Sequence, residues 1–482
     1  MKKIGLLGLL FFSFVVIFSS CIKKQNPQTN IPLEKIELVF WNVFDDSDVF
    51  QGPIQAYQSL NPQVNITYKK FNIVDEYEKL LVNEIAEGEG PDILAIKNTW
   101  IDTHFKKFTP FPVGRTKVPM NPQIFEETFF YTAAQDLIRE GQIYAIPLYI
   151  DTLALFYNKQ IFRNNIPNSD KPAETWEEIK TQVSMITKEN NSLERFAISG
   201  IALGRHDNIV HANDIFYALM LEHQVNMFNE LFNQAIFASQ QGTKNEGEPY
   251  YPLVDSLLLY SSFANSRYKN YCWNDAITSM DKHTKELNPF IRGKVAMIFG
   301  YSYLYEDLLA LREQLKKEGE SVINETEIGV VEFPQINSFA ETGTRNAFPM
   351  YFPLTVSRNS QYPDIAWDFI QYLASYDSLK NYYEKTHKPT SRKDMVDEQM
   401  IDPIYGIFAR QASYASSFPN KFPLSESFLN LVFQEVIEKA VKNKQNLIDI
   451  VKNAQKKVNC QLDKIKNLGE KEFNCLNLDS KD

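Results

Sequence analysis

The stretch that decides the fold is residues 36–96, which read IELVFWNVFDDSDVFQGPIQAYQSLNPQVNITYKKFNIVDEYEKLLVNEIAEGEGPDILAI. Residues 36–41 are rich in β-branched and aromatic side chains, apolar positions alternate in residues 64–71, and residues 93–96 form a short apolar run. Each of these patterns is typical of a β-strand. We therefore expect three strands within this stretch.

Two helices are expected between these strands. Pro53 is predicted to open the first, because proline is favoured in the first turn of a helix. The apolar residues expected on one face of this helix are Ile54, Tyr57 and Leu60. Asp75 and Glu78 resemble a capping box at the start of the second helix, which Gly88 would end. Strands and helices that alternate with short connections predict a parallel sheet in an α/β fold.

The residues that follow the first and third strands are the first candidates for a binding site. In parallel sheets, ligands lie beyond the carboxyl ends of the strands. Aromatic faces pack on the C–H faces of sugar rings, and carboxylates and amides bind paired hydroxyls. Buried core residues and helix caps use the same side chains, so that alternative stays open. The candidates are Trp41, Asn42, Asp45, Asp46, Asn98 and Trp100.

The N-terminus predicts export. Lys2 and Lys3 precede an apolar run over residues 4–17, which is shorter than a membrane-spanning helix requires. The run ends just before Cys21, and this arrangement resembles a bacterial lipobox, although Phe18 stands where leucine is usual. We expect cleavage before Cys21 and a lipid on its thiol, which would hold the chain at a bacterial membrane outside the cytoplasm. An uncleaved anchor and a plain secretory leader are the alternatives.

Composition narrows the class of protein further. Residues 1–20 are assigned to the signal peptide and residues 21–33, rich in Asn, Gln, Lys and Pro, to a solvated tether. The remaining length suggests two or three domains. A net charge of -10 argues against a nucleic-acid partner, because phosphates require a basic face.

Three further cysteines are too few for a disulfide scaffold. Cys460 and Cys475 are a possible disulfide that would clip the C-terminal tail, if the compartment is oxidising. Cys272 lies between Tyr271 and Trp273, which favours a buried apolar cysteine.

Several segments resemble, in order, those of the maltose-binding-protein-like family of extracellular solute-binding proteins, the capture components of ABC importers. No single segment is decisive, but their order along the chain makes chance similarity improbable. The segments are LVFW (38–41), YQSLNPQVNITY (57–68), YEKLLVNEIAEGEGPDILAI (77–96), GQIYAIPLYIDTLALFYNKQIF (141–162), TWEEIK (175–180), FIRGKVAMIFGYSYL (290–304), AWDFIQYLAS (366–375) and HKPTSRKD (387–394).

The resemblance implies a two-lobed, periplasmic-binding-protein-like α/β fold, with a ligand cleft between discontinuous domains. The stretch 205–288 matches the family poorly and is expected to elaborate the second lobe. The implied boundaries are 34–149 plus 348–393 for lobe one, 150–345 plus 394–457 for lobe two, and 458–482 for a C-terminal tail.

The resemblance also nominates ligand-binding residues. It points to the two loops already described, to the first crossing between the lobes, to the segment after GKVAMIFG and to the returning strand. Tyr303 takes a position where the family often has tryptophan. Trp176 and Trp367 match structural positions and are excluded from the site. The additional candidates are Tyr149, Asp151, Tyr301, Tyr303 and Tyr351.

The implied function is capture of a carbohydrate, for which we expect an oligosaccharide, and its delivery to ABC permease subunits by a monomeric protein. We expect no cofactor and no metal. A non-sugar solute, such as a polyol phosphate, a polyamine or a metal, is one alternative. An exported receptor of the same fold that serves no permease is another, and a secreted glycan-processing enzyme is a third.

Enzymatic motifs are not found in the sequence. It contains no G-x-S-x-G, H-E-x-x-H, P-loop or G-x-G-x-x-G pattern. The adjacent carboxylates Asp45 and Asp46 are a poor glycosidase pair, because neighbouring side chains diverge. A histidine-rich stretch has spacing that fits no standard metal site. Its members are His206, Asp207, His211, Asp214 and His223.

Overall fold

A computed structural model describes residues 35–190, 195–244, 247–277, 284–417, 424–442, 445–466 and 475–477. The predicted signal peptide, the lipidation site Cys21 and the tether lie outside these residues. All the elements below belong to one unit, Ile36–Asp482. No helix in the described part is both long and apolar enough to cross a bilayer.

A five-stranded sheet organises lobe one, in the order β2-β1-β3-β14-β4. The strand β1 pairs in parallel with β2 and with β3, which confirms the predicted α/β class. The last strand along the chain, β14, returns from lobe two and lies antiparallel between β3 and β4. These strands are β1 (Ile36–Val43), β2 (Val64–Phe71), β3 (Ile93–Ala95), β4 (Phe108–Thr109) and β14 (Leu354–Ser357).

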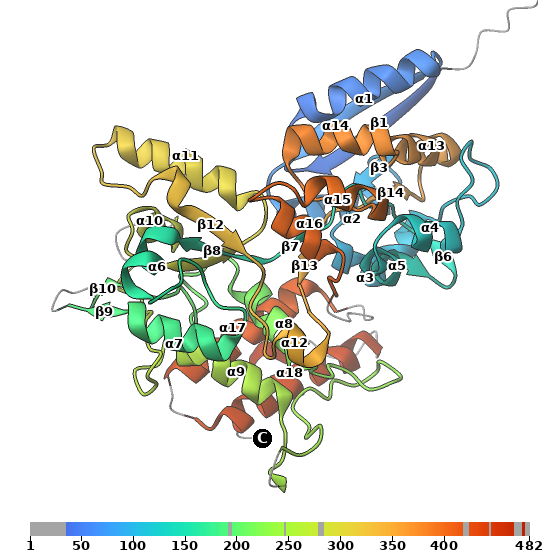
Figure 1. Ribbon diagram of the computed structural model, residues 1–482. Coiled ribbons are helices and arrows are strands. Elements are labelled where there is room, and N and C mark those ends of the chain that lie inside the picture. Colours follow the sequence, from blue (N-terminus) through green and yellow to red (C-terminus); the bar gives the residue numbers. More distant parts are fainter. Residues whose placement is uncertain are drawn as a thin grey trace, which may run out of the picture. The chain divides into compact units, whose positions relative to one another are not determined.

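Helices pack against this sheet (Figure 1), and α1, α13 and α14 contact one another. The other elements of this part are short helices and a small β-ribbon. The bounds are α1 (Ser47–Leu60), α2 (Val74–Glu87), η1 (Asn98–Trp100), α3 (Ile101–His104), η2 (Phe105–Lys107), α4 (Pro122–Thr128), α5 (Tyr131–Leu137), β5 (Ile138–Arg139), β6 (Gln142–Ile143), α13 (Pro363–Leu373), α14 (Tyr376–Thr386), η5 (Lys393–Met395) and α15 (Val396–Gln399).

Two expected helix starts were wrong in detail. The helix α1 begins at Ser47, and Pro53 lies inside it. Phe50 is buried against Phe40 of the sheet, and this packing extends the helix ahead of the proline. Leu60 is 72% exposed and does not share the buried face. The helix α2 begins at Val74 without a side-chain cap, although it ends at Gly88 as predicted, in the left-handed conformation (φ 86°).

Lobe two is built on a three-stranded antiparallel sheet in the order β11-β8-β12. The central strand, β8, is fully buried. These strands are β8 (Ala154–Asn158), β11 (Met297–Gly300) and β12 (Ile328–Val331).

Helices from three separate stretches of the chain complete lobe two. Their bounds, with those of the short elements, are α6 (Lys159–Asn165), α7 (Trp176–Ile186), β9 (Lys188–Glu189), β10 (Phe196–Ile198), α8 (Ala212–Glu222), α9 (Pro252–Ser262), α10 (Leu287–Ile291), α11 (Leu304–Lys317), η4 (Glu325–Glu327), α12 (Phe339–Thr342), α16 (Gly406–Ala412), α17 (Glu426–Lys442), α18 (Leu447–Lys466) and η6 (Cys475–Asn477).

Two antiparallel segments carry the chain between the lobes. The strand β7 (Asp151–Thr152) leaves lobe one, and β13 (Pro349–Met350) returns to it. Asp151 pairs with Met350 in this ribbon. The crossing therefore brings a buried carboxylate to the junction of the lobes.

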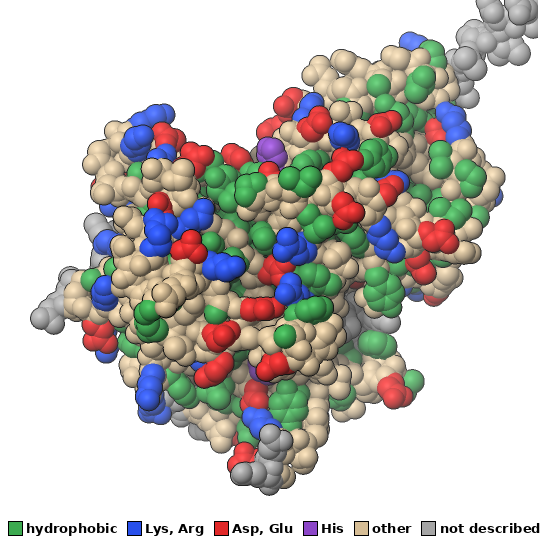
Figure 2. Space-filling model, viewed as in Figure 1, with side chains coloured by type: hydrophobic (Ala, Val, Ile, Leu, Met, Phe, Trp, Pro, Cys, Tyr) green, Lys and Arg blue, Asp and Glu red, His purple; other side chains and the backbone are tan. Residues whose placement is uncertain are grey.

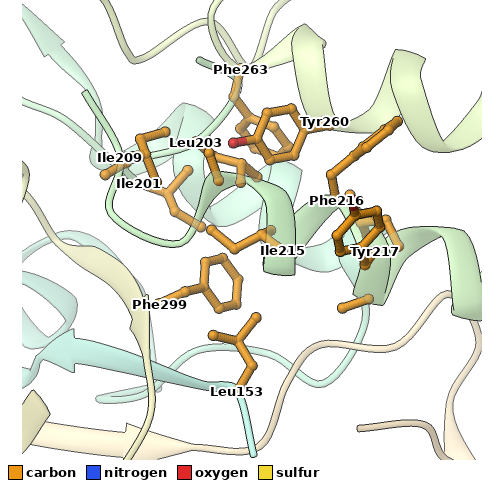
Figure 3. Close-up of a cluster of buried hydrophobic side chains, with 14 of the residues drawn as sticks. Leu153, Ile201, Leu203, Ile209, Ile215, Phe216, Tyr217, Tyr260, Phe263 and Phe299 are labelled. Atoms are coloured by element: carbon orange, nitrogen blue, oxygen red, sulfur yellow. The ribbon is translucent and has the colours of Figure 1, made fainter. Parts of the chain in front are cut away.

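The buried hydrophobic residues form two separate clusters. One surrounds the β1 sheet, and the other surrounds the β8 sheet and the helices α8, α9, α17 and α18. Figure 3 shows part of the second cluster, to which α8 contributes Ile215 and Phe216. The ring of Phe216 lies 5.8 Å from that of Tyr260 of α9. The stretch 205–288 thus contributes to the core of lobe two.

Some residues pack differently from the expected boundaries. Met395 and Ala412, beyond residue 394, join the first cluster. The Phe129–Arg392 bridge lies near Met395, and the Thr132 hydroxyl donates to the carbonyl of Ala415 near Ala412. Val458 and Leu462 of α18 are buried in the second cluster instead of belonging to a tail. A disulfide joins Cys460 to Cys475.

Three residues excluded from the site have structural positions. Trp176 and Trp367 are fully buried, as predicted. Cys272 is buried, and its thiol donates to the carbonyl of Ile201, which confirms the prediction of a buried apolar cysteine.

Candidate functional site

A cavity of about 820 Å³ lies between the two clusters. Both lobes and the crossing segments contribute side chains to it, and most of those side chains are aromatic, apolar or acidic. The lining residues are Phe44, Val74, Asp75, Glu78, Lys97, Trp100, Tyr149, Asp151, His206, Asn213, Tyr303, Asp307, Met350, Phe352, Lys388, Glu426, Ser427, Asn430, Leu431 and Gln434.

The lobe-one wall follows the carboxyl ends of β1 and β3. Phe44 comes directly after β1 with a positive φ of 69°, and its ring packs edge-on against Phe352 of the returning segment. Trp100 lies in η1, just after β3, and stacks on Tyr77 of α2. The topology therefore places two aromatic side chains at the sheet edge where ligands of α/β proteins bind.

The lobe-two wall consists of the start of α11 and one face of α17. Tyr303 is 38% exposed and precedes α11, whose first turn contains Asp307. Burial, and then the nearby Glu306, raise the pKa of Asp307. Asn213 of α8 also lines the cavity, and its Oδ1 has no hydrogen-bond partner in the described part of the chain. This wall offers an aromatic face together with acceptors for hydroxyl groups.

Asp151 joins the crossing strand to lobe two. Its carboxylate accepts hydrogen bonds from the Ser302 amide (3.0 Å), the Ser302 hydroxyl (2.7 Å) and the Thr152 amide (2.9 Å). Burial raises the pKa of Asp151 to about 6, although the Ser302 and Thr152 donors oppose this rise. Since Ser302 precedes Tyr303, Asp151 fixes the backbone that carries the aromatic face of lobe two.

Lys388 is held at the cavity by a buried carboxylate. Its Nζ lies 2.5 Å from Oδ1 of Asp45 and 4.5 Å from the centre of the Tyr149 ring. Oδ2 of Asp45 accepts from the Tyr382 hydroxyl (2.8 Å) and the Asn42 amide (3.3 Å). Asp45 and Asn42 thus position Lys388 and do not line the cavity themselves.

Lys97 and Thr99 connect lobe one to lobe two through Glu426. Lys97 Nζ lies 2.5 Å from one carboxylate oxygen of Glu426, and the Thr99 hydroxyl donates to the other at 2.7 Å. Burial lowers the pKa of Lys97, but the charge and hydrogen bond of Glu426, together with the charges of Asp214 and Asp75, outweigh it and the pKa is raised overall. The ion pair forms a direct contact between the two walls of the cavity.

Asn98 and Tyr351 converge on a buried carboxylate behind this contact. Oδ2 of Asp136 accepts from the Ser417 hydroxyl (2.6 Å), the Tyr351 hydroxyl (2.7 Å) and the Asn98 amide (3.2 Å). Burial raises the pKa of Asp136 to about 6 against the effect of these donors. Asn98 and Tyr351 therefore bind within the protein and do not line the main cavity.

Tyr301 is fully buried beneath Tyr303. Its hydroxyl donates to Asp214 at 3.1 Å, and Asp214 also contacts His211 at 3.2 Å. The other ring nitrogen of His211 lies 3.1 Å from the Tyr303 hydroxyl. Burial alone would raise the pKa of Asp214, but the bond from His211 and the charge of Lys97 lower it. Asp214 and His211 thereby hold the ring of Tyr303.

The remaining candidates lie away from the cavity. Trp41 packs against Phe71 in the core, with Lys69 over its ring, because its side chain points to the other face of β1 from Asn42. Asp46 is exposed and pairs with Lys70. Of the eleven binding candidates, those that line the cavity are Trp100, Tyr149, Asp151 and Tyr303.

Sequence reasoning missed the residues that α17, α2 and the segment after α14 contribute. Lys388 lies in the HKPTSRKD segment, which had been used only as a family signal. The residues of α17 that line the cavity occupy the mostly polar face of a helix whose other face is buried in the core. A polar stripe on a core helix is a weak signal, because most such stripes face only solvent.

No three His, Cys, Asp or Glu side chains are grouped to hold a metal ion in the described ranges. His211 and Asp214 do lie together, as a hydrogen-bonded pair within the support of Tyr303.

Comparisons with known proteins agree with this geometry. Residues 54–404 match the family described as bacterial extracellular solute-binding proteins. A binding protein of Brucella abortus (strain 2308) is 21% identical over 331 residues, which cover 68% of this chain and 69% of that protein.

Two solved structures share the fold. The sugar-binding protein MalE of Xanthomonas citri superposes with a TM-score of 0.69 at 18% identity, over 91% of this chain and 100% of that one. The cyclic alpha-maltosyl-1,6-maltose binding protein of Arthrobacter globiformis gives a TM-score of 0.65 at 16% identity, over 89% and 99%. At these identities the likeness shows a two-lobed solute-binding fold.

Proposed function

Because this chain belongs to the bacterial extracellular solute-binding proteins, we propose that it captures an oligosaccharide between its two lobes and delivers it to an ABC transporter permease. The family places the chain outside the cytoplasm. The observation that carries the carbohydrate proposal is a large interlobe cavity with aromatic faces on both walls and carboxylates around them. This is the chemistry that suits rings with C–H faces and hydroxyl edges.

Charge supports a neutral or cationic solute over an anionic one. The cavity is lined by Asp75, Glu78, Asp151, Asp307 and Glu426. Its two lysines each contact a carboxylate, Lys97 with Glu426 and Lys388 with Asp45. A phosphate group would therefore meet more acceptors than unpaired cations.

Capture is proposed to proceed by closure of lobe one, built on the β1 sheet, against lobe two, built on the β8 sheet. A solute that contacts both walls binds the closed state more tightly than the open one, so it shifts the equilibrium toward closure. Trp100, Tyr149, Asp151 and Tyr303 are proposed as ligand contacts. The candidates behind them would hold these contacts in place.

The test uses isothermal titration calorimetry with a panel of mono- and oligosaccharides. Phe44→Ala and Tyr303→Ala each remove one aromatic face, and both rings are partly exposed (42% and 38%), so the fold should survive. Each change should raise Kd at least about fivefold, because an aromatic contact contributes about 1 kcal/mol beyond its buried area. Tyr131→Ala, at an exposed tyrosine outside the cavity, is the control.

The outcomes separate the competing functions. The carbohydrate proposal fails if no saccharide binds while a polyol phosphate, a polyamine or a metal ion does. If the protein also consumes the sugar that it binds, the function is glycan processing and the capture proposal fails. Delivery predicts permease genes beside this one, and the ATP hydrolysis of the transporter that they encode should rise only with the loaded protein. No such stimulation would favour a receptor.

The lipid anchor is proposed from the sequence, and it supports delivery by keeping the protein near its permease. Mass spectrometry of the mature N-terminus should find acylated Cys21. An intact leader or an unmodified terminus would exclude the lipoprotein.

A further inference from the structure

A second, smaller cavity adjoins the first. It measures about 200 Å³ and is lined by Arg205, His206, Asp207, Glu438, Val441 and Lys442. His206 lines the main cavity as well, so the two spaces share a wall. We call the smaller space the annex.

One helix forms a wall of both spaces. Along α17, residues from Glu426 to Gln434 line the main cavity, whereas Glu438 and Lys442 line the annex. Asn430, Gln434, Glu438 and Lys442 are four residues apart, so they lie along one face of the helix. The opposite face is buried in lobe two. With about 1.5 Å per residue, the exposed face runs for about 24 Å from Glu426 to Lys442.

The annex is polar, and its charges are balanced. Arg205 donates to both carboxylate oxygens of Asp207, at 2.9 and 2.8 Å. Oε1 of Glu438 accepts from the Gln434 amide at 3.0 Å. Burial, and then Lys285, lower the pKa of His206, which favours its neutral form. Two cations, Arg205 and Lys442, therefore face two carboxylates.

Such a surface suits neutral groups that both donate and accept hydrogen bonds. A hydroxyl group does both. An anion would meet Asp207 and Glu438, and a cation would meet Arg205 and Lys442, so neither is favoured by charge. A neutral solute suits the main cavity as well, and the annex continues the main cavity along α17.

We propose that the annex binds the far end of a neutral oligosaccharide whose other end occupies the main cavity. This proposal rests on the proposed function, and it deepens that function by assigning a site to the far end of the chain and a preference for longer chains. The protein selects extended chains over disaccharides, because only an extended chain reaches from the aromatic walls to Glu438.

Calorimetry with malto-, manno- and cello-oligosaccharides of two to seven units tests the proposal on the mature full chain. Within the series that binds, the longest member should bind at least roughly tenfold more tightly than the disaccharide. Glu438→Ala and the isosteric Glu438→Gln should remove most of this gain and leave the Kd of the disaccharide within about twofold.

Glu318→Ala is the matched control, because Glu318 of lobe two accepts the same kind of hydrogen bond, from Gln314 at 3.0 Å, outside both cavities. Glu318→Ala should change neither the gain in affinity with chain length nor the Kd of the disaccharide. Equal affinity for short and long chains, or equal weakening of both by the Glu438 variants, overturns the annex and leaves capture of sugars intact. Failure of every series to bind refutes the proposed carbohydrate function itself.

Discussion

Replacing Asp136 by asparagine should change how the stability of the protein depends on pH. Asp136 is buried, and its pKa is raised from 3.8 to about 6. Between these two values the folded protein holds a proton on this group that the unfolded chain has lost. The free energy of unfolding therefore falls as pH rises through this window.

The size of the effect follows from the shift. A displacement of about two pKa units corresponds to about 3 kcal/mol, at about 1.4 kcal/mol per unit. All three donors, from Ser417, Tyr351 and Asn98, bind the same oxygen, Oδ2. The amide oxygen of Asp136→Asn can occupy that position and keep every bond. The variant thus isolates the cost of the buried charge.

Urea unfolding followed by tryptophan fluorescence, at several pH values from about 4 to 7, measures the difference. The unfolding free energy of Asp136→Asn should match that of the unchanged protein near the low end. Near the high end of this pH range, the unfolding free energy of Asp136→Asn should be about 3 kcal/mol larger than that of the unchanged protein. Asp170→Asn, at an exposed loop carboxylate, is the control and should show no such trend. A difference that is constant with pH, or that reverses in sign, would refute the reasoning.

Three further changes should act on other parts of the molecule. Glu426→Gln leaves Lys97 without its charged partner between the lobes and should weaken ligand binding about tenfold, as measured by calorimetry. Glu177→Gln, which removes the exposed pair with Lys180, is the control and should change binding little. Equal effects of the two changes would contradict a role of Glu426 in closure. Gly204→Ala places a Cβ 2.7 Å from the backbone nitrogen of Ala264, at a φ of 101°, and should lower the free energy of unfolding in urea by about 3 kcal/mol or more. Gly242→Ala, where the added Cβ meets open space, is the control and should lower it much less. Similar losses in the two variants would show that the structure relaxes around the Cβ at residue 204. Replacing Cys460 and Cys475 with serine should lower the free energy of unfolding by about 3 kcal/mol, because the disulfide closes a loop of 15 residues. An unchanged unfolding midpoint would contradict this stabilising role of the disulfide.

The sheet of lobe one could be predicted from the sequence because its strands carry strong local patterns. Ile36–Val43 and Val64–Phe71 are both β-rich, and the connections between them leave few topologies. The start of α1 could not be predicted, since the packing of Phe50 on Phe40 extends the helix past Pro53. Tertiary packing here overrides the local signal of a proline.

The site was harder to predict than the fold. Trp41 and Asn42 are neighbours that we expected in one loop, but both lie in β1, whose geometry turns them to opposite faces, and neither lines the cavity. Lys388 reaches the cavity only because Asp45, distant in sequence, binds it. Such long-range pairs leave no pattern in a single sequence.

The helix α17 divides its residues between two tasks without overlap. Leu429, Val432, Phe433, Val436 and Ile437 belong to the core, whereas the residues that face the two cavities are mostly polar. If this face binds the solute as proposed, substitutions along it should alter solute recognition without repacking lobe two. A new solute specificity would then evolve by substitutions on this one face of α17, while the core residues of lobe two stay the same.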